Sequence, residues 1–439
     1  MAHSKSTFRL GILLYISEGA SIERFGPMPS QEKLRLVVLG SGFAGFSLLK
    51  QIDTNIFDVT AVSPRNYFLF TPLLPSTTVG TIGFRSIIEP IRHVSPDVRY
   101  YHARCTYIDV KGKNIACEGE GDRGQFTLPY DILVIAIGAV SNTYGIPGVI
   151  EHALFLKDIR DAQLIRRRLI ECFEQAARPG VTPDDRRRLL HFVVVGGGPT
   201  GVEVTAEMHD FLRQDLEEVF PDLAPHVTIT LLEAADQILN AFDEELRAYT
   251  TRLFQRRRIQ VCTGSLVVRV DKHTIFLGNG TEIPYGLAVW STGIGPTELA
   301  RTLPFPKDRD FCILTDEYFR VHGTESIYAI GDCALVGGKN LPATAQVAQQ
   351  QGRFLARHLK GVKRGKPLQA FRYRHYGMLA YVGGRKALAD LESFKGRGFS
   401  TWLFWRSAYL TRLVSLKNKL LVLFDWFITF IFGRDISRL

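Results

Sequence analysis

The sequence lacks any two cysteines close enough to form a CxxC motif. It contains six cysteines in 439 residues, and no two are closer than Cys105 and Cys117. This spacing excludes the usual cysteine-rich zinc sites and leaves no metal site to predict. It also excludes a redox-active cysteine pair of the CxxC type. We therefore expect unpaired thiols and a reducing compartment.

The sequence also lacks an apolar run long enough to cross a membrane. The longest run near the C-terminus, Leu420 to Phe432, is interrupted by Asp425, whereas a spanning helix needs about 20 apolar residues. The short patch 10-LGILLYI-16 has neither the cleavage site of a signal peptide nor the arginine content of a mitochondrial presequence. We expect residues 1–33 to be a disordered N-terminal extension, and Met28 could equally be the natural start.

No nucleic-acid-binding motif accompanies the basic residues, although the net charge is +10. Three arginine triplets, at 166–168, 186–188 and 256–258, lie in polar stretches without interleaved aromatic residues. Such triplets are typical of solvated helix faces. The charge therefore favours an anionic membrane surface or a phosphorylated ligand, and no nucleic acid is expected as a partner.

Two glycine-rich turns follow apolar segments that are typical of buried parallel strands. The first follows 34-LRLVVLG-40 and the second follows 190-LHFVVVG-196, and both have G-x-G-x-x-G spacing. In this motif the first glycine makes the turn, the second admits a pyrophosphate and the third lets helix and strand pack closely. The six glycines are Gly40, Gly42 and Gly45, then Gly196, Gly198 and Gly201. Two copies in one chain predict two dinucleotide sites.

An acidic residue at the end of the next strand usually binds the ribose hydroxyl groups. Glu233 follows the strand-like segment 227–232 in the second unit, after a polar helix over 208–223 that lengthens the crossover. A carboxylate there would repel a 2′-phosphate, so we expect this site to prefer NADH to NADPH. In the first unit Ser63 occupies this position, and Arg65 beside it is expected to hold the pyrophosphate or stack on adenine.

A third nucleotide signal lies in 324-TESIYAIGDCA-334, which predicts a strand, a turn at Gly331-Asp332 and then a helix. The aspartate could bond a ribityl or ribose hydroxyl group. Two further apolar strands, at 131–138 and 286–293, each end in a small residue and glycine. Together with the two glycine turns, these segments predict a flavin held by both ends of a split domain.

The chain resembles the type II NADH:quinone oxidoreductases, or alternative NADH dehydrogenases, and most resembles their fungal and plant mitochondrial branch. The segments that carry the resemblance are 63-SPRNYFLFTPLLPSTTVGT-81, 86-SIIEPIR-92, 195-VGGGPTGVE-203, 329-AIGDCA-334, 341-LPATAQVAQQQG-352, 376-YGMLAYVG-383 and 423-LFDWFITFIF-432. The resemblance implies an α/β fold of two Rossmann-like domains, one inserted in the other, and a C-terminal amphipathic membrane-anchoring module. The expected boundaries are 34–148 with 312–372 for FAD, 149–311 for NADH, and 373–439 for membrane binding and dimerisation.

The resemblance also assigns the sites and the reaction, which is transfer of two electrons from NADH through resident FAD to a quinone. Expected FAD contacts are Gly40, Gly42, Phe43, Ala44, Gly45, Ser63, Pro64, Arg65, Cys105, Ala136, Gly138, Gly331, Asp332, Thr344 and Ala345. Expected NADH contacts are Gly196, Gly198, Pro199, Thr200, Gly201, Glu233, Thr292 and Gly293. Among the catalytic candidates, Glu203 would position NADH, ionised by the helix N-terminus, while Gln346 and Gln350 would bond the quinone carbonyls. The lone Cys333 is expected to be a small packed residue.

Residues 399–439 combine tryptophan, phenylalanine and leucine with six lysines and arginines. This pattern predicts a pair of interfacial amphipathic helices on an anionic membrane, or alternatively a buried C-terminal helix or dimer interface. Trp405 and Tyr409 could line a quinone entrance. We expect a homodimeric peripheral enzyme that pumps no protons and acts on ubiquinone or menaquinone, at the cytoplasmic face of a bacterial membrane or else at the mitochondrial inner membrane. A flavoprotein with a soluble acceptor and a non-catalytic NADH-binding flavoprotein resembling apoptosis-inducing factors remain alternatives.

Overall fold

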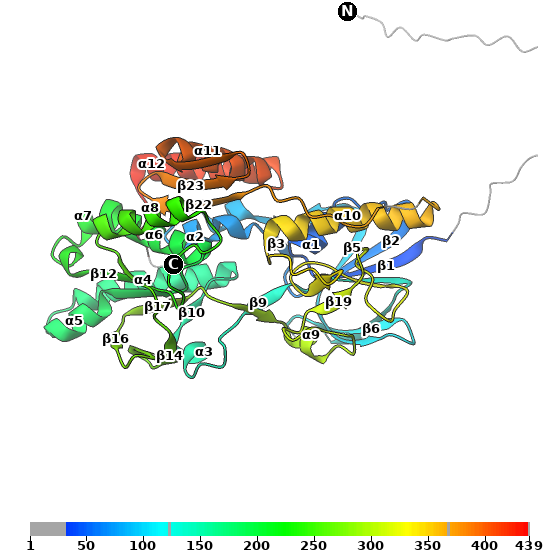
Figure 1. The fold of residues 1–439 in the computed structure, drawn as a ribbon, viewed down its shortest axis with the longest axis horizontal. Coiled ribbons are helices and arrows are strands. Elements are labelled where there is room, and N and C mark those ends of the chain that lie inside the picture. Colours follow the sequence, from blue (N-terminus) through cyan, green and yellow to red (C-terminus); the bar gives the residue numbers. More distant parts are fainter. Residues whose placement is uncertain (1–31, 122–123, 367–368, 438–439) are drawn as a thin grey trace, which may run out of the picture. The chain divides into compact units, whose positions relative to one another are not determined.

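The first glycine turn follows β1 (Leu34–Leu39), the middle one of five parallel strands in a seven-stranded sheet of the computed structural model (Figure 1). The first five strands across this sheet run parallel, and the last two continue it as an antiparallel meander. In spatial order the strands are β20 (Ile327–Ala329), β8 (Ile132–Ile135), β1 (Leu34–Leu39), β2 (Phe57–Ser63), β5 (Val98–Asp109), β6 (Asn114–Gly119) and β7 (Gln125–Pro129). Strands β1 and β8 in the middle of the parallel part are almost wholly apolar, as expected for strands covered on both faces.

The second glycine turn leaves the central strand of a separate five-stranded sheet in which every strand pair is parallel. In spatial order its strands are β10 (Leu154–Phe155), β17 (Leu287–Trp290), β11 (His191–Val195), β12 (Thr228–Leu232) and β13 (Gln260–Cys262). The two predicted dinucleotide-binding units therefore have separate sheets, as the repeated motif indicated.

Along the chain, the unit with the second sheet interrupts the unit with the first. Strand β20 follows the second sheet in sequence but pairs with β8 of the first sheet. The two crossings between the sheets are joined as an antiparallel pair of β9 (Ala139–Ser141) and β18 (Ile294–Pro296). This topology confirms the predicted α/β fold with one Rossmann-like unit inside the other. The exact boundaries given above stay predictions.

The prediction of a helix directly after Gly331-Asp332 is wrong. The chain instead forms the short strand β21 (Ala334–Val336), which pairs with β19 (Ile313–Thr315). Gly337 and Gly338 follow with φ angles of 53° and 69°, a left-handed conformation that a helix does not tolerate. The next helix, α10 (Ala345–Lys363), begins at the predicted polar segment, where the side chain of Thr344 caps it.

The remaining elements are shorter or connect the two sheets. The helices are α1 (Phe43–Leu49), α2 (Leu74–Thr77), α3 (Val149–His152), α4 (Ile159–Ala176), α5 (Pro183–Leu189), α6 (Pro199–Phe211), α7 (Glu217–Val219), α8 (Glu244–Arg256) and α9 (Glu298–Thr302). The small strands are β3 (Tyr67–Leu69), β4 (Ile88–Pro90), β14 (Val267–Val270), β15 (Thr274–Leu277) and β16 (Glu282–Pro284). A π-helical segment, Leu212–Leu216, joins α6 to α7, so the helix predicted over 208–223 is real but irregular.

A C-terminal module, residues 378–432, follows the split domain. It consists of an antiparallel sheet, β22 (Met378–Gly383), β23 (Lys386–Leu391) and β24 (Phe394–Gly398), and two helices, α11 (Phe399–Arg412) and α12 (Leu416–Phe432). The helices lie over β23 in Figure 1. The predicted helix pair is thus present. Within the described part of the chain, no helix has the length and apolarity that crossing a membrane requires.

The structure describes residues 32–121, 124–366 and 369–437. Predictions for residues 1–31, including the disordered extension and the start at Met28, lie outside this range. Residues Leu34–Leu439 form one compact unit.

Candidate functional site

The first glycine turn is packed on two sides and open on the third. Gly40 has a φ of 103°, and a side chain there would collide with the carbonyl group of Ala136 at the end of β8. A methyl group at Gly45 would collide with the carbonyl oxygen of Gly40. At Gly42, in contrast, a methyl group would meet no atom within 4 Å. The turn therefore exposes main chain at the position where the motif admits a pyrophosphate.

The Gly331-Asp332 turn reaches this same site from the far end of the split domain. A methyl group on Gly331 would lie 3.2 Å from the side chain of Ala44 in α1. The main-chain N–H of Gly331 donates to Oε1 of Gln351 at 2.6 Å, and Gln351 is buried. Burial raises the pKa of Asp332, a setting in which hydrogen bonds from a ligand's hydroxyl groups would stabilise the carboxylate.

Sequence analysis missed Gln351 because nothing in the local pattern separates it from its two glutamine neighbours. Its importance comes from the packing of α10 on α1. A side chain at the next residue, Gly352, would collide with the carbonyl oxygen of Ala44, so the two helices approach closely and Gln351 reaches the turn. A glycine inside a polar helix was the one available signal of that approach.

Ser63 and Arg65 take part in hydrogen bonds next to the first glycine turn. The hydroxyl groups of Ser63 and Ser41 lie 2.9 Å apart, and both are buried. Nη1 of Arg65 bonds Asp158 at 2.7 Å, and the hydroxyl group of Tyr67 donates to the same carboxylate at 2.6 Å. Nε of Arg65 is buried without a partner among the described residues, so Arg65 retains a donor for a ligand.

The cysteines are all free thiols, as predicted. Cys333 is buried and packs under the nucleotide turn, which confirms its reading as a small core residue, and burial raises its pKa to about 12. Cys105 lies opposite Cys117 on neighbouring strands, and both are buried. The Cys105 thiol bonds the carbonyl oxygen of Tyr107. Its predicted contact with FAD remains a prediction.

The second glycine turn repeats the first. Gly196 has a φ of 112°, and a methyl group at Gly198 would meet no atom within 4 Å. A methyl group at Gly196 would lie 2.8 Å from Cβ of Thr292, so the predicted Thr292-Gly293 segment does border the turn. Glu233 also lies here: its carboxylate accepts the N–H of Gly197 at 2.6 Å. The structure thus brings these predicted NADH contacts together.

Glu203 lies on α6, which begins at the second glycine turn, and is only 6% exposed. Its Oε1 accepts the N–H of Tyr381 from β22 at 3.0 Å. Burial raises the pKa of Glu203 to about 8. The prediction that the helix N-terminus keeps this carboxylate ionised is therefore wrong near neutral pH, because desolvation under the C-terminal module outweighs the dipole.

Trp405 and Tyr409 of α11 lie on the other side of Glu203. Their ring centroids are 4.9 Å apart, and Trp405 is buried against Tyr381. Burial raises the pKa of the Tyr409 phenol well above its usual value, and the nearby Glu203 contributes in the same direction. The two residues predicted to line a quinone entrance therefore adjoin the carboxyl group of Glu203, near the start of α6.

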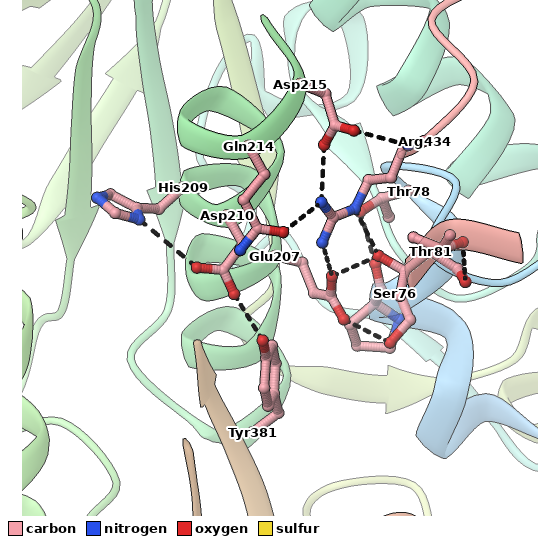
Figure 2. A network of polar contacts seen from close by, with 12 residues as sticks. Ser76, Thr78, Thr81, Glu207, His209, Asp210, Gln214, Asp215, Tyr381 and Arg434 are labelled. Atoms are coloured by element: carbon pink, nitrogen blue, oxygen red, sulfur yellow. Dashed lines mark hydrogen bonds and ion pairs between the residues drawn. The ribbon is translucent and has the colours of Figure 1, made fainter. Parts of the chain in front are cut away.

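A buried polar network that the sequence did not predict lies one turn beyond Glu203 on α6 and includes Glu207 and Asp210 (Figure 2). The carboxylate of Glu207 accepts the hydroxyl groups of Ser76 at 2.6 Å and Thr81 at 2.8 Å. Arg434, at the C-terminal end of the chain, lies 3.8 Å from Glu207 and bonds Asp215 at 2.8 Å. Arg434 is nearly buried, and its Nε also donates to the hydroxyl group of Thr81 at 2.9 Å, so it fastens the end of the chain to both Rossmann-like units.

Asp210 extends the same network on the next turn of α6. It accepts the hydroxyl group of Tyr381 at 2.6 Å (Figure 2), and Arg257 lies 3.6 Å away. Burial opposes ionisation, but bonds from His209 and Tyr381 hold the pKa of Asp210 below its usual value.

The prediction that the three arginine triplets lie on solvated helix faces is wrong for two of their members. The side chain of Arg257 is only 14% exposed, and Arg166 pairs with Asp435.

Gln346 and Gln350 share one face of α10, as predicted, and both hold the segment 373–377. Nε2 of Gln346 donates to the carbonyl of Gly377, and its Oε1 accepts the N–H of Tyr376. Gln350 makes a two-way pairing with the main chain of Arg374. These bonds give both amides a structural role, and their contact with a quinone remains a prediction.

A cavity of about 550 Å³ lies between α6 and the C-terminal module. One wall carries the polar network and the other carries aromatic rings, with Arg406 stacked between Trp402 and Trp426 at 4.1 and 4.4 Å. Burial lowers the pKa of Arg406 to about 10. The lining residues are Ser76, Thr81, Glu207, Gln214, Asp215, Tyr381, Arg385, Phe399, Trp402, Trp405, Arg406, Trp426, Thr429, Phe430, Gly433 and Arg434.

Helix α12 has an inner side where Asn418 lies beside the apolar Val422 and Trp426, and an outer side that is largely apolar. On the inner side, Asn418 bonds the carbonyl groups of Ser86 and Ile88, and Asp425 accepts the N–H of Gly83. The aspartate that interrupts the apolar run therefore faces the protein. The exposed side consists of Leu416, Leu420, Leu423, Phe424, Phe427, Phe430, Ile431 and Phe432. Apolar patches of this kind mark interaction surfaces.

Comparison with known proteins places this geometry in a class. A family model described as pyridine nucleotide-disulphide oxidoreductase matches residues 34–352, and the chain belongs to this class of two-dinucleotide flavoproteins. A second model, the NDH2 C-terminal domain, matches residues 375–435. Within the class, the chain belongs to the type II NADH dehydrogenase (NDH2) family, as the sequence indicated.

Relatives in this family align over nearly the whole chain. An internal alternative NAD(P)H-ubiquinone oxidoreductase A1 of Arabidopsis thaliana mitochondria is 43% identical over 94% of this chain and 87% of its own. An external alternative NADH-ubiquinone oxidoreductase of Yarrowia lipolytica mitochondria is 40% identical over 98% of this chain and 84% of its own. The structure of NDH2 from Plasmodium falciparum in complex with NADH has a TM-score of 0.88 at 29% identity, covering 92% of this chain and 100% of that one.

The family binds FAD, and the first turn fits that cofactor. The open side of Gly42 and the unpartnered Nε of Arg65 would suit a pyrophosphate, and the carboxylate of Asp332 would suit a hydroxyl group of the cofactor.

Proposed function

We propose that this chain oxidises NADH and reduces a quinone of the ubiquinone type through bound FAD, without pumping protons. One turnover converts NADH, one proton and quinone into NAD⁺ and quinol. The observation that carries the proposal is the placement of Glu203. It lies on the helix that leaves the second glycine turn, bonds the C-terminal sheet and adjoins Trp405 and Tyr409, so it lies where a nucleotide domain meets the module that would face a membrane.

In this proposal the first turn would hold FAD, which would supply the two-electron chemistry between NADH and quinone. The domain over 34–148 and 312–372 would hold FAD through the FAD contacts predicted from the sequence, among them Gly42 and Asp332. The domain over 149–311 binds NADH. Glu233 already orders the second glycine turn through the N–H of Gly197, and its free lone pairs would accept the ribose hydroxyl groups.

The quinone would approach from the side of the C-terminal module. Gln346 and Gln350 brace the segment 373–377, so we propose that they shape the wall of the quinone path and that their amides reach the carbonyl groups only after small rearrangements. Glu203 is mostly neutral at pH 7, which removes a buried negative charge from a site that must accept electrons.

Residues 399–439 would attach the enzyme to a membrane surface through the outer side of α12. The exposed leucines and phenylalanines would enter the interface, while the inner side stays bound to the protein. Part of the module could also join two copies of the chain. The mitochondrial names of relatives favour the mitochondrial inner membrane over the bacterial cytoplasmic face.

The acceptor tests the proposal against its alternatives. NADH oxidation measured with a short-chain ubiquinone should be much faster than with ferredoxin. The reverse result would indicate a reductase with a soluble acceptor, and turnover with neither would indicate a non-catalytic NADH-binding flavoprotein. Phe427→Asp, on the exposed side of α12, should release the protein from vesicles while leaving turnover with the soluble quinone intact.

A further inference from the structure

A second, smaller pocket lies between α8 and the C-terminal sheet, away from the nucleotide turns. Its volume is about 180 Å³, and four of its six lining residues are cationic. The lining residues are Tyr249, Arg252, Leu253, Arg256, Lys386 and Arg397. A concave surface lined by one sign of charge concentrates counter-ions.

The charge in this pocket is poorly neutralised. Arg252 and Arg256 are four residues apart on α8, a spacing at which like charges repel. In the described part of the chain, neither of them nor Lys386 has an ion pair or side-chain hydrogen bond, whereas Arg397 bonds Glu245 at 2.7 Å. Four cations therefore face one carboxylate. Three unpaired cations around one pocket repel one another, so their arrangement favours a bound anion over a plain solvated helix face.

Two lining residues of the pocket are close in sequence to residues at the apolar surface of the C-terminal module. Arg397 precedes by two residues Phe399, which opens α11 and is 57% exposed. Lys386 follows Arg385, whose guanidinium group lies 5.2 Å from the ring centre of Phe430 on α12, and Phe430 is 69% exposed. A ligand with an anionic head and apolar chains could therefore occupy the pocket and the adjoining surface together.

We propose that this pocket binds the phosphodiester headgroup of an anionic phospholipid, with the acyl chains directed toward the surface of α11 and α12. Guanidinium groups match phosphate oxygens in paired hydrogen bonds, so Arg252 and Arg256 are the principal ligands. Lys386 and Arg397 supply charge from the opposite wall. This inference rests on the membrane attachment proposed above and adds to it the lipid class and the residues that select it.

The test compares binding of the full-length, FAD-loaded protein to vesicles of phosphatidylcholine and to vesicles that also contain phosphatidylglycerol. Arg252→Gln/Arg256→Gln should lose about 25-fold in affinity for the anionic vesicles, since a cation near such a surface contributes about fivefold. Its binding to phosphatidylcholine and its turnover with a short-chain quinone should not change. Lys272→Gln/Arg309→Gln removes the same charge outside the pocket and should retain most of the anionic preference.

Equal losses in the two double variants would reduce the effect to net charge and overturn the pocket, as would no loss in either. Protection against heat by inorganic phosphate as strong as that by anionic vesicles would assign the pocket to free phosphate and overturn the lipid. The wild-type protein could fail to bind phosphatidylcholine vesicles yet bind anionic vesicles through these arginines. That result would contradict the apolar membrane attachment in the proposed function but support the pocket.

Discussion

Glu203→Gln replaces a buried carboxyl group with a neutral amide of nearly the same shape. The amide oxygen can still accept the N–H of Tyr381, which Glu203 accepts at 3.0 Å. In the folded protein, burial raises the pKa of Glu203 from 4.5 to about 8. At pH 7 this difference corresponds to about 3 kcal/mol of folding free energy that the carboxyl group costs and the amide does not.

The sign of the effect follows from where the proton binds more tightly. Because the folded pKa lies above the unfolded one, the folded protein holds the proton longer, and the contribution of Glu203 to stability is present at low pH. It is lost as pH rises from about 4.5 to about 8 and then stays constant. Between about pH 5 and pH 9 the variant should therefore gain about 4 kcal/mol relative to the wild type.

Thermal unfolding of the two proteins across this pH range, at constant ionic strength, measures the effect. The difference in unfolding temperature should widen in favour of Glu203→Gln up to about pH 8 and then level off. Glu218→Gln, at an exposed carboxylate on α7, is the matched control and should follow the wild type. A difference between Glu203→Gln and wild type that does not change with pH would refute the assignment of a neutral, desolvated Glu203.

Three other substitutions test separate parts of the site. Glu233→Gln should narrow the preference for NADH over NADPH, and an unchanged ratio of kcat/KM for the two would remove Glu233 from ribose recognition. Gly42→Ala should fold normally but purify with less FAD, because its methyl group enters only the open side of the turn, whereas Gly45→Ala should lower the unfolding temperature. If Gly42→Ala lost FAD but also lowered the unfolding temperature as much as Gly45→Ala, the result would count against the turn as the flavin site. Arg434→Gln should cost about 3–5 kcal/mol in denaturant unfolding, since it leaves buried carboxylates unpaired; a loss under about 1 kcal/mol would contradict the buried network.

The nucleotide turns could be predicted from sequence because their chemistry is local. An apolar strand, three glycines and a helix define each turn within about a dozen residues, and Gly40 and Gly196 have the expected positive φ angles. Glu233 and Asp332 were also found, since each lies at the end of a strand. The insertion of one domain in the other followed from the order of these signals along the chain.

The charge state of Glu203 could not be predicted in this way. The helix N-terminus is visible in the sequence and favours ionisation, but the desolvation that reverses it comes from residues such as Tyr381, which is 178 positions away. The network of Glu207 and Arg434 has the same origin, because its partners are more than 200 residues apart. A local sequence pattern gives no register for such contacts.

The roles of Gln346 and Gln350 show a related difficulty. Their spacing correctly placed them on one helix face, but the identity of what that face meets depends on the irregular segment 373–377, which has no periodic signal. The helix predicted after Asp332 failed for a local reason: the adjacent Gly337 and Gly338 adopt left-handed conformations, and a Gly-Gly pair is itself a turn signal that argued against the helix.

The relay from NADH through flavin to quinone is tested most directly by anaerobic stopped-flow spectroscopy of the purified, FAD-loaded protein. NADH should bleach the flavin absorbance, and a short-chain ubiquinone mixed in afterwards should restore it within the time of one turnover. A flavin that NADH reduces but quinone leaves reduced, or a protein that takes up no flavin when FAD is supplied, would contradict the account.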